Sequence, residues 1–338
     1  YIEVTKPLAV VTGPGGGSGK LATCLSQLYH EYKRGTRARY AKFETFPIWN
    51  LPLKHPVNIA YEAATADLKD VNMIDSFHLE VYGEMAVNYN RDLEVFPVVK
   101  RIIEKITGAA EYQSPTDMGV NRAGFCIYDD EAVREAAVQE IIRRFIIAKC
   151  DYKKGKITAD SLERSELLMK EVNAKEDDRA VVNAAREYAE YKRRCDKYVN
   201  VVVMAIEMPD GTMVTGRSSR RMVAAAAAVL NAAKTIAGID DEKYVIAPNV
   251  FRDIQDLKAN ILKHDRISLN VEEILTAQSI SAERNPCAQL ACRQLEGLSG
   301  CKAHCTAILS DRDEQTLRSM GIDVTCDPEY VTTNLYFA

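Results

Sequence analysis

The stretch "GPGGGSGK" near the start of the chain, residues 13–20, carries residue types that bind anions. Glycines have no Cβ atom, so several backbone N–H groups can converge on one anion, and a helical pattern starts directly after them. A lysine at a helix N-terminus faces the positive end of the helix dipole, and a bound anion would offset this repulsion. The sequence therefore predicts a phosphate-binding loop made of Gly13, Gly15, Gly16, Gly17, Ser18, Gly19 and Lys20.

Three interpretations of this loop stay open, and two of them name a nucleotide. The Walker pattern GxxxxGK(S/T) of ATP-binding loops fits in part, but Leu21 replaces the hydroxyl residue that holds Mg²⁺. The dinucleotide pattern GxGxxA fits Gly17, Gly19 and Ala22, and Glu44 ends the next expected strand, where it could bind a ribose hydroxyl. The third interpretation is a structural turn that lets the first helix pack close to a sheet.

Carboxylates that could hold Mg²⁺ or polarise a water molecule follow in two segments. Asp129 and Asp130 end the apolar run 124–128, as the acids of a Walker B strand do, and Asp117 lies in a turn-rich loop. The alternative is that Asp129 or Asp130 caps the next helix. Among the histidines, His55 in a loop with three prolines is the best acid–base candidate. These four residues are the catalytic candidates.

Candidates for substrate binding come from two arginine-containing segments. Asn90 and Arg91 lie together in a polar stretch, and arginine beside amide side chains suits a carboxylate or a phosphate. Turns built from Asx and Ser hydrogen bonds would look the same. Arg217 precedes Ser218, which could cap the following alanine-rich helix, and two further arginines come next. We expect a second bound anion at that helix start.

The spacing of cysteine and histidine does not support zinc or peptidase chemistry. Cys301, His304 and Cys305 lie close in sequence, but neighbours on a strand point to opposite faces, and a second ligand pair is missing. Cys292 follows Cys287 at five positions, too far for the PCxxC element of zinc deaminases. The HExxH and GxSxG patterns of peptidases are missing too. We therefore expect no zinc and no other bound structural metal.

The elements that position these residues divide into three predicted parts, at residues 1–125, 126–197 and 198–338. The first part alternates strand-like and helix-like stretches, with strands expected at 7–12 and 38–44, which is the βαβ pattern of a parallel sheet. The second reads as long charged helices. The third starts with a hairpin at Asp210-Gly211 and continues with an alanine-rich helix and a strand, helix, strand order. We predict an α/β fold with a P-loop or Rossmann-like core, a helical subdomain and a C-terminal α/β domain of deaminase-like topology.

Composition limits the partners of the chain. It has 338 residues, 47% of them apolar, and a net charge of −4 without a broad basic surface, which argues against nucleic acid. The apolar stretch 222–230 is far shorter than the roughly 20 residues that span a bilayer. Nine scattered cysteines indicate a reduced, cytoplasmic protein. The start at Tyr1 rather than Met indicates a fragment. A homo-oligomer is among the open assembly states.

Whole phrases of the sequence resemble one bacterial family, known as domain of unknown function 1846. They include "VVTGPGGGSGKLATCLSQLYHEYKRG", "VNYNRDLEVFPV", "SPTDMGVN" and "DDEAVREAA", and the resemblance runs over essentially all of the chain. It implies the same three-part architecture, and longer members with a further N-terminal Rossmann-like portion, so that this chain looks like a C-terminal two-thirds. It implies no catalytic residue, and the label ATP-dependent peptidase of some members has no motif to support it here.

These residues together predict an enzyme that binds a phosphorylated small molecule at the glycine-rich loop. The expected ligand is ATP or another nucleotide, with Mg²⁺ as a further candidate. Two alternatives stay open: an oxidoreductase that binds NAD(P) with Glu44 on the ribose, and a non-catalytic ligand-binding or assembly protein.

Overall fold

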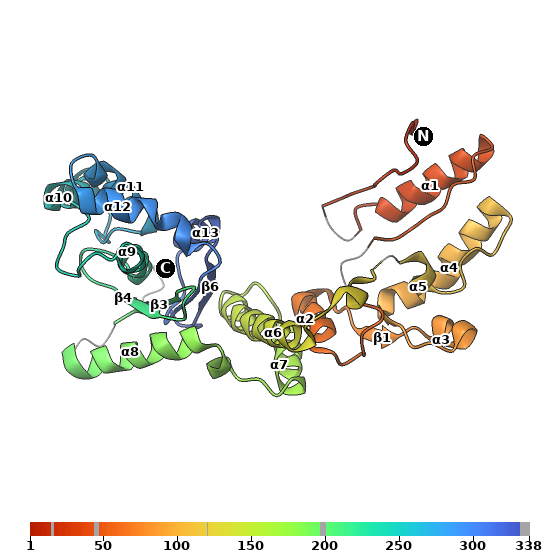
Figure 1. Ribbon diagram of the computed structural model, residues 1–338, viewed down its shortest axis with the longest axis horizontal. Helices are drawn as coiled ribbons and strands as arrows, with labels where there is room; N and C mark the ends of the chain where they lie inside the picture. Colours follow the sequence, from red (N-terminus) through yellow and green to blue (C-terminus); the bar gives the residue numbers. More distant parts are fainter. Residues whose placement is uncertain (15–16, 44–46, 120, 197–200, 332–338) are drawn as a thin grey trace. The chain divides into compact units, whose positions relative to one another are not determined.

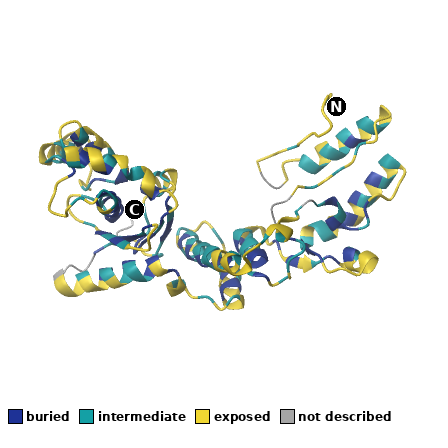
Figure 2. Cartoon of the chain, viewed as in Figure 1, coloured by how far each residue is buried: buried dark blue, intermediate teal, exposed yellow. Residues whose placement is uncertain are grey.

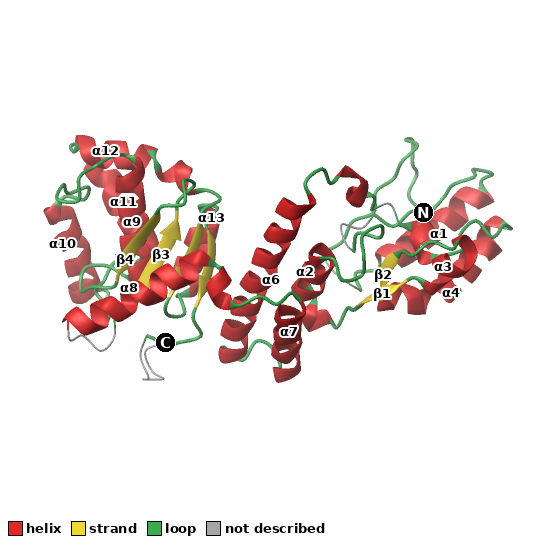
Figure 3. Ribbon diagram, turned by 60° about the horizontal axis from the view of Figure 1, so that its bottom comes forward, coloured by secondary structure: helices red, strands yellow, loops and turns green. Residues whose placement is uncertain are grey.

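The computed structural model describes residues 1–14, 17–43, 47–119, 121–196 and 201–331 (Figure 1). The chain forms two compact units, Tyr1–Ile141 and Ile142–Ala338. Helix α6, Asp130–Lys153, contributes residues to both units. Helices and strands occur together, so the predicted mixed α/β class is confirmed (Figure 3). The three-part division of the sequence stays a prediction.

The first unit is mainly helical and holds one small sheet. Its strands β1, Asn72–Ile74, and β2, Val87–Tyr89, pair antiparallel. Buried apolar side chains join α1 to α4, with Leu28 of α1 packed among Phe96, Val99 and Ile103 of α4. The helices are α1 (Lys20–Lys33), α2 (Pro56–Ala64), α3 (Ser76–Tyr82), α4 (Asn90–Thr107) and α5 (Pro115–Met118), with short 3₁₀ turns at Ala66–Leu68 and Ala123–Cys126.

Neither strand expected beside the first helix is formed, so the predicted parallel βαβ sheet is wrong for the described residues. Residues 7–12 have no regular structure, and Leu8 and Val10 are exposed. In the second expected strand, Lys42 forms only an isolated bridge with Gly119. A strand is stable when a neighbour accepts and donates its backbone hydrogen bonds, and the described residues supply no such neighbour for residues 7–12. The described residues of this unit therefore do not confirm the P-loop or Rossmann-like topology.

The second unit is built on a four-stranded sheet with the strand order β4-β3-β5-β6. Its strands are β3 (Val203–Glu207), β4 (Met213–Arg217), β5 (Lys302–Cys305) and β6 (Asp323–Cys326). β3 pairs antiparallel with β4 and β5, while β5 and β6 are parallel. The hairpin at Asp210-Gly211 is confirmed, with Gly211 at a φ of 82°. The predicted order of hairpin, helix, strand, helix and strand is confirmed too, whereas a deaminase-like topology stays a prediction.

Helices cover both faces of this sheet, and the alternation of residues along β3 decides which face packs where. Val203 and Ala205 join the buried cluster of α8, and Met204 and Ile206 join that of α9. Figure 1 shows α8 and α9 on opposite sides of β3, and Figure 2 shows the strands and α9 as buried. The helices are α7 (Ala159–Glu171), α8 (Ala180–Asp196), α9 (Ala224–Ile236), α10 (Pro248–Asp256), α11 (Val271–Ala282), α12 (Pro286–Arg293) and α13 (Asp311–Ser319), with a π-helical turn at Leu257–Ile261 and 3₁₀ turns at Glu176–Asp178 and Leu295–Leu298.

The cysteines carry free thiols and differ in their exposure to solvent. Cys126 in the first unit and Cys195 in the second are exposed, and the other seven are partly or fully buried. Within the described residues, no helix is both long and apolar enough to cross a bilayer. The cytoplasmic location stays a prediction.

Candidate functional site

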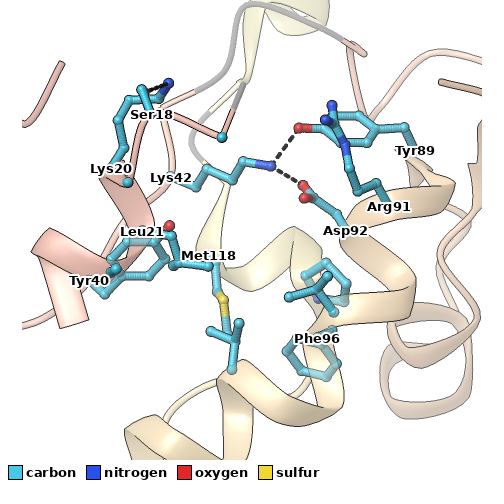
Figure 4. Close-up of a pocket in the computed structure, with 16 residues that line it drawn as sticks. Ser18, Lys20, Leu21, Tyr40, Lys42, Tyr89, Arg91, Asp92, Phe96 and Met118 are labelled. Carbon is cyan, nitrogen blue, oxygen red and sulfur yellow. Dashed lines mark hydrogen bonds and ion pairs between the residues drawn. The ribbon is translucent and has the colours of Figure 1, made fainter. Parts of the chain in front are cut away.

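The glycine-rich loop and the start of α1 border a cavity of about 570 Å³ in the first unit (Figure 4). The segment around Tyr40 and Lys42 and the first turns of α4 form its other walls. A cavity of this size can enclose a small-molecule ligand. We call it the loop cavity.

The loop presents backbone N–H groups at the cavity. Gly17 and Gly19 have φ values of 73° and 86°, which side chains other than glycine rarely adopt. Gly19 caps α1 without a side-chain hydrogen bond, and the first turn contains no acidic residue. A Cβ atom at Gly13 would lie 2.4 Å from Ser18 Oγ, so the Ser18 side chain would have to move. Gly15 and Gly16 lie outside the described residues. The helix start therefore offers donors to an anion without a protein carboxylate in its first turn.

Three cationic side chains line the loop cavity against one acidic side chain, Asp92. Lys20 Nζ donates a hydrogen bond to Ser18 Oγ at 3.1 Å. Lys42 Nζ donates to the Tyr89 hydroxyl and forms an ion pair with Asp92 (Figure 4). Arg91 binds the buried carboxylate of Asp70, which does not line the cavity, at 2.8 Å. The charge of the lining favours an anionic ligand.

Apolar side chains form the wall of the loop cavity opposite these cations. Figure 4 shows Leu21, Tyr40, Met118 and Phe96 on this side, away from the Lys42 ammonium group. Phe96 and Met118 are buried in the cluster that joins α1 to α4. The cavity is thus cationic beside the glycine-rich loop and apolar on the opposite wall. This arrangement suits a ligand with one charged end and one apolar or aromatic end.

The loop cavity brings together some of the residues predicted for binding and leaves out others. Gly17, Ser18, Gly19, Lys20 and Arg91 line it. Asn90, although adjacent to Arg91, accepts a hydrogen bond from Val71 N at 3.1 Å and supports the backbone beside β1. Glu44 lies outside the described residues. The binding role of the residues that line the cavity stays a prediction.

The catalytic candidates near the start of α6 form a helix-capping cluster apart from the loop cavity. His55 is buried, its Nδ1 accepts a hydrogen bond from Val57 N, and its Nε2 lies 2.9 Å from Asp130 Oδ1. Arg134, and secondarily His55, hold the pKa of the Asp130 carboxyl below its usual value. Asp129 accepts a hydrogen bond from Ala132 N at 3.0 Å and so caps α6.

The Walker B interpretation of these acids is wrong, because no strand precedes them. Residues 123–126 form a 3₁₀ turn, and Phe125 and Tyr128 are exposed. An apolar run forms a buried strand only where a sheet receives it, and here the run lies at the surface. The capping alternative holds for Asp129, whereas Asp130 is the first residue of α6 and binds Arg134 and His55.

Asp117 caps α5 and borders a different cavity. Its carboxylate accepts hydrogen bonds from Gln113 N at 2.7 Å and Ser114 N at 3.0 Å, and Ser114 Oγ accepts from Asp117 N in return. This reciprocal arrangement is a capping box, which fixes the start of α5.

Ser218 does not cap the alanine-rich helix, because that helix begins six residues later. α9 starts at Ala224, and its cap residue Val223 makes no side-chain hydrogen bond. Ser218 Oγ accepts a hydrogen bond from Val202 N beside the sheet, and Arg217 is exposed at the end of β4. The segment before α9 is extended and hydrogen-bonded to Leu269, which keeps it out of the helix.

Lys42 and Tyr89 are site residues that the sequence did not single out. Lys42 and Tyr40 alternate along an extended segment, so both point into the loop cavity, but nothing in the local pattern shows which element they face. Tyr89 ends β2 and meets Lys42 across 47 positions of sequence. Long-range pairs of this kind leave no local signal.

Comparison with known proteins identifies the family. The model of "Domain of unknown function DUF1846, N-terminal" matches residues 1–173, and its C-terminal counterpart matches residues 177–336. The chain belongs to the DUF1846 family. A UPF0371 protein of Clostridium botulinum (strain Langeland) is 60% identical over the whole chain, and one of Clostridium tetani is 59% identical. The chain spans 68% of the length of each of these relatives.

The DUF1846 C-terminal region contains an ionic network that joins β5, the residue after β6 and α8. His304 of β5 is fully buried, with Nδ1 2.9 Å from Thr325 Oγ1 and Nε2 3.3 Å from Asp327 Oδ1. Arg186 of α8 binds Asp327 and also Glu176. Within the described residues, no group of three or more metal-ligating side chains is close enough to hold a metal ion. The burial of His304 places this side chain in the interior of the second unit.

The pKa values in this network predict that acid destabilises the protein. Burial lowers the pKa of His304, Arg186 and Arg179 lower it further, and Asp327 opposes them. The unfolded chain then takes up this proton at a higher pH, near 6.5, than the folded chain does. We expect the free energy of unfolding to fall as the pH drops below about 6.5, by up to about 1.4 kcal/mol per pH unit.

Urea unfolding between pH 7.5 and 5.5 measures this dependence. His304→Gln removes the titrating group and should flatten the slope, whereas His264→Gln, which replaces an exposed histidine of the same unit, should leave it unchanged. An equal slope in the wild type and in His304→Gln would show that another group controls the pH dependence.

Proposed function

We propose that this chain binds a phosphorylated small molecule, ATP or another nucleotide, in the loop cavity, and that the ligand takes part in an enzymatic reaction. The observation that carries the proposal is that the glycine-capped start of α1 borders the same cavity as Lys20, Lys42 and Arg91. Backbone donors at a helix N-terminus and nearby cations are the standard elements of phosphate recognition.

The phosphates and the base of such a ligand would contact different walls of the loop cavity. The phosphates would lie at Gly17 and Lys20, where the N–H groups of the first turn and a lysine converge. A base or other apolar group would lie against Tyr40 and Phe96 on the opposite wall. Asp92 is the acidic side chain among the lining residues and could hold a phosphate-bound Mg²⁺, a role for which Leu21 offers no hydroxyl.

The alternatives differ in what they require. A dinucleotide oxidoreductase depends on Glu44 at the end of a strand, and the described residues 38–43 form no strand there. A non-catalytic or assembly protein with a structural turn requires no ligand at all. Under the turn interpretation, Lys42 and Arg91 would serve only their ion pairs with Asp92 and Asp70.

Replacing Lys20 by alanine tests the proposal. Removing one charge-assisted contact costs about 1.5 to 3 kcal/mol, so Lys20→Ala should weaken nucleotide binding roughly 10- to 150-fold. Stability without ligand should stay the same or rise slightly, because a cation leaves the positive end of α1. Calorimetric titration with ATP, GTP, NAD and NADP measures the affinities, and thermal unfolding without ligand measures the stability.

The matched control is Lys33→Ala, which removes the same charge from the other end of α1. It should leave the affinity unchanged. If none of the four nucleotides binds, or if Lys20→Ala and the control bind equally well, the loop is a structural turn and the proposed function is wrong.

A further inference from the structure

A second cavity, of about 580 Å³, lies in the first unit and is separate from the loop cavity. Residues of one extended segment divide between them, since Tyr40 and Lys42 line the loop cavity and Arg39 lines the second. Helix α5 divides in the same way: Pro115 and Met118 face the loop cavity, and Thr116 and Asp117 face the second. Tyr40 N donates a hydrogen bond to the hydroxyl of Tyr112, another lining residue of the second cavity, at 3.0 Å. The two cavities therefore share a wall.

Aromatic rings form one side of the second cavity. The His78 ring lies 4.6 Å from the Tyr82 ring and 5.9 Å from the Trp49 ring, centroid to centroid. Trp49 is held in place by its carbonyl, which accepts a hydrogen bond from Val87 N at 2.9 Å. His78 is buried, whereas the Tyr82 side chain is about half exposed at the rim. Grouped rings of this kind offer stacking surface to a flat ligand.

Polar groups lie beside the rings. His78 Nδ1 lies 3.0 Å from Ser114 Oγ, while its Nε2 has no hydrogen-bond partner among the described residues. The Tyr82 hydroxyl donates to Asp117 Oδ2 at 3.1 Å. Arg122 and Glu84 add one donor group and one acceptor group to the lining. A ligand with both donors and acceptors on its edge can therefore be satisfied here.

The charges of the lining argue against a phosphate in this cavity. Two arginines, Arg39 and Arg122, stand against three acidic side chains, and Arg39 lies 3.8 Å from one of them, Glu111. This balance is opposite to that of the loop cavity and disfavours anions.

We propose that the second cavity binds a planar, uncharged heteroaromatic molecule of the nucleoside class. The ring of the base stacks on Tyr82 and Trp49, and its polar edge meets His78 Nε2 and the side chains of Glu84 and Arg122. The site is independent of the phosphate proposed for the loop cavity, because its lining and its charge differ.

The only tryptophan of the chain, Trp49, lines this cavity and reports on it directly. Titration of adenosine, guanosine, cytidine and uridine into the full chain should produce a saturable change in Trp49 fluorescence with at least one nucleoside, and calorimetry should give the same dissociation constant. Tyr82→Leu removes a stacking ring from a half-exposed position and should weaken binding roughly 5- to 150-fold. Tyr82→Phe keeps the ring and should retain most of the affinity.

Two controls make the result specific. Tyr29→Leu replaces a similarly exposed tyrosine on α1 that lines neither cavity, and should leave the affinity unchanged. Lys20→Ala, in the loop cavity, should leave it unchanged too. The inference is overturned if no nucleoside gives a saturable response, if Tyr82→Leu binds as tightly as the wild type, or if inorganic phosphate displaces the nucleoside.

Discussion

Gly216→Ala is expected to lower the free energy of unfolding by about 3 kcal/mol, the upper end of the cost of overpacking a core. A Cβ atom at Gly216 of β4 would lie 2.1 Å from Ala228 N and 2.6 Å from Ala227 C, both backbone atoms of α9. Backbone cannot rotate out of the way as a side chain does. The sheet and α9 would have to move apart, which opens the core that Met204 and Ile206 share with that helix. Urea denaturation of the wild type and the variant measures the difference.

Gly297→Ala is the matched control in the same unit. A Cβ atom there meets only Ile236 Cδ1, at 3.4 Å, and that contact is the movable end of a side chain. Its effect should stay within about 0.5 kcal/mol. Equal stabilities for Gly216→Ala and Gly297→Ala would show that β4 and α9 are not packed as closely as the structure has them.

Arg186→Met is expected to cost about 3 kcal/mol of stability. Arg186 neutralises Asp327 and Glu176, whose side chains are only 15% and 17% exposed. Burial raises the pKa of Asp327, but His304 and Arg186 outweigh it and hold this pKa well below its usual range. Removal of the guanidinium leaves two partly buried carboxylates without this partner. The cost lies at the lower end for such a change, because a third of the Arg186 side chain is exposed to water.

Arg194→Met is the control for this prediction. Arg194 lies on the same helix, α8, and pairs with Glu190 one turn away, but its side chain is 75% exposed. An exposed pair of this kind contributes about 0.5 kcal/mol or less. Urea unfolding at pH 7 compares the two variants. A loss for Arg186→Met as small as that for Arg194→Met would mean that the network does not stabilise the fold.

The second unit was predictable from sequence because its signals are local. Asp210-Gly211 between two apolar runs specifies a hairpin, and the structure has this hairpin between β3 and β4. In the first unit, the strand prediction for residues 7–12 is wrong, because strand formation depends on a neighbouring strand that a local pattern does not reveal.

In the candidate site, too, the residues with local sequence signals were predictable and those brought together by long-range contacts were not. The loop from Gly17 to Lys20 was found because glycines and a helix start are local features. Lys42 was missed because its partners Tyr89 and Asp92 come from another element. Asp130 shows a different limit: acids at a helix start read equally well as caps and as catalytic groups, and the local pattern does not reveal that His55 lies 2.9 Å from this carboxylate.

The distribution of thiols gives the chain a ready pair of labelling positions. Burial raises the pKa of Cys150 and Cys305 to about 12, so these thiols stay protonated and react slowly with alkylating dyes. Cys126 and Cys195 are exposed, and each unit holds one of them. Maleimide dyes should therefore attach preferentially to one position in each unit of the unaltered protein. The efficiency of energy transfer between the two dyes would then report the distance between the units in solution. It could be compared with and without each ligand, and no cysteine would have to be engineered.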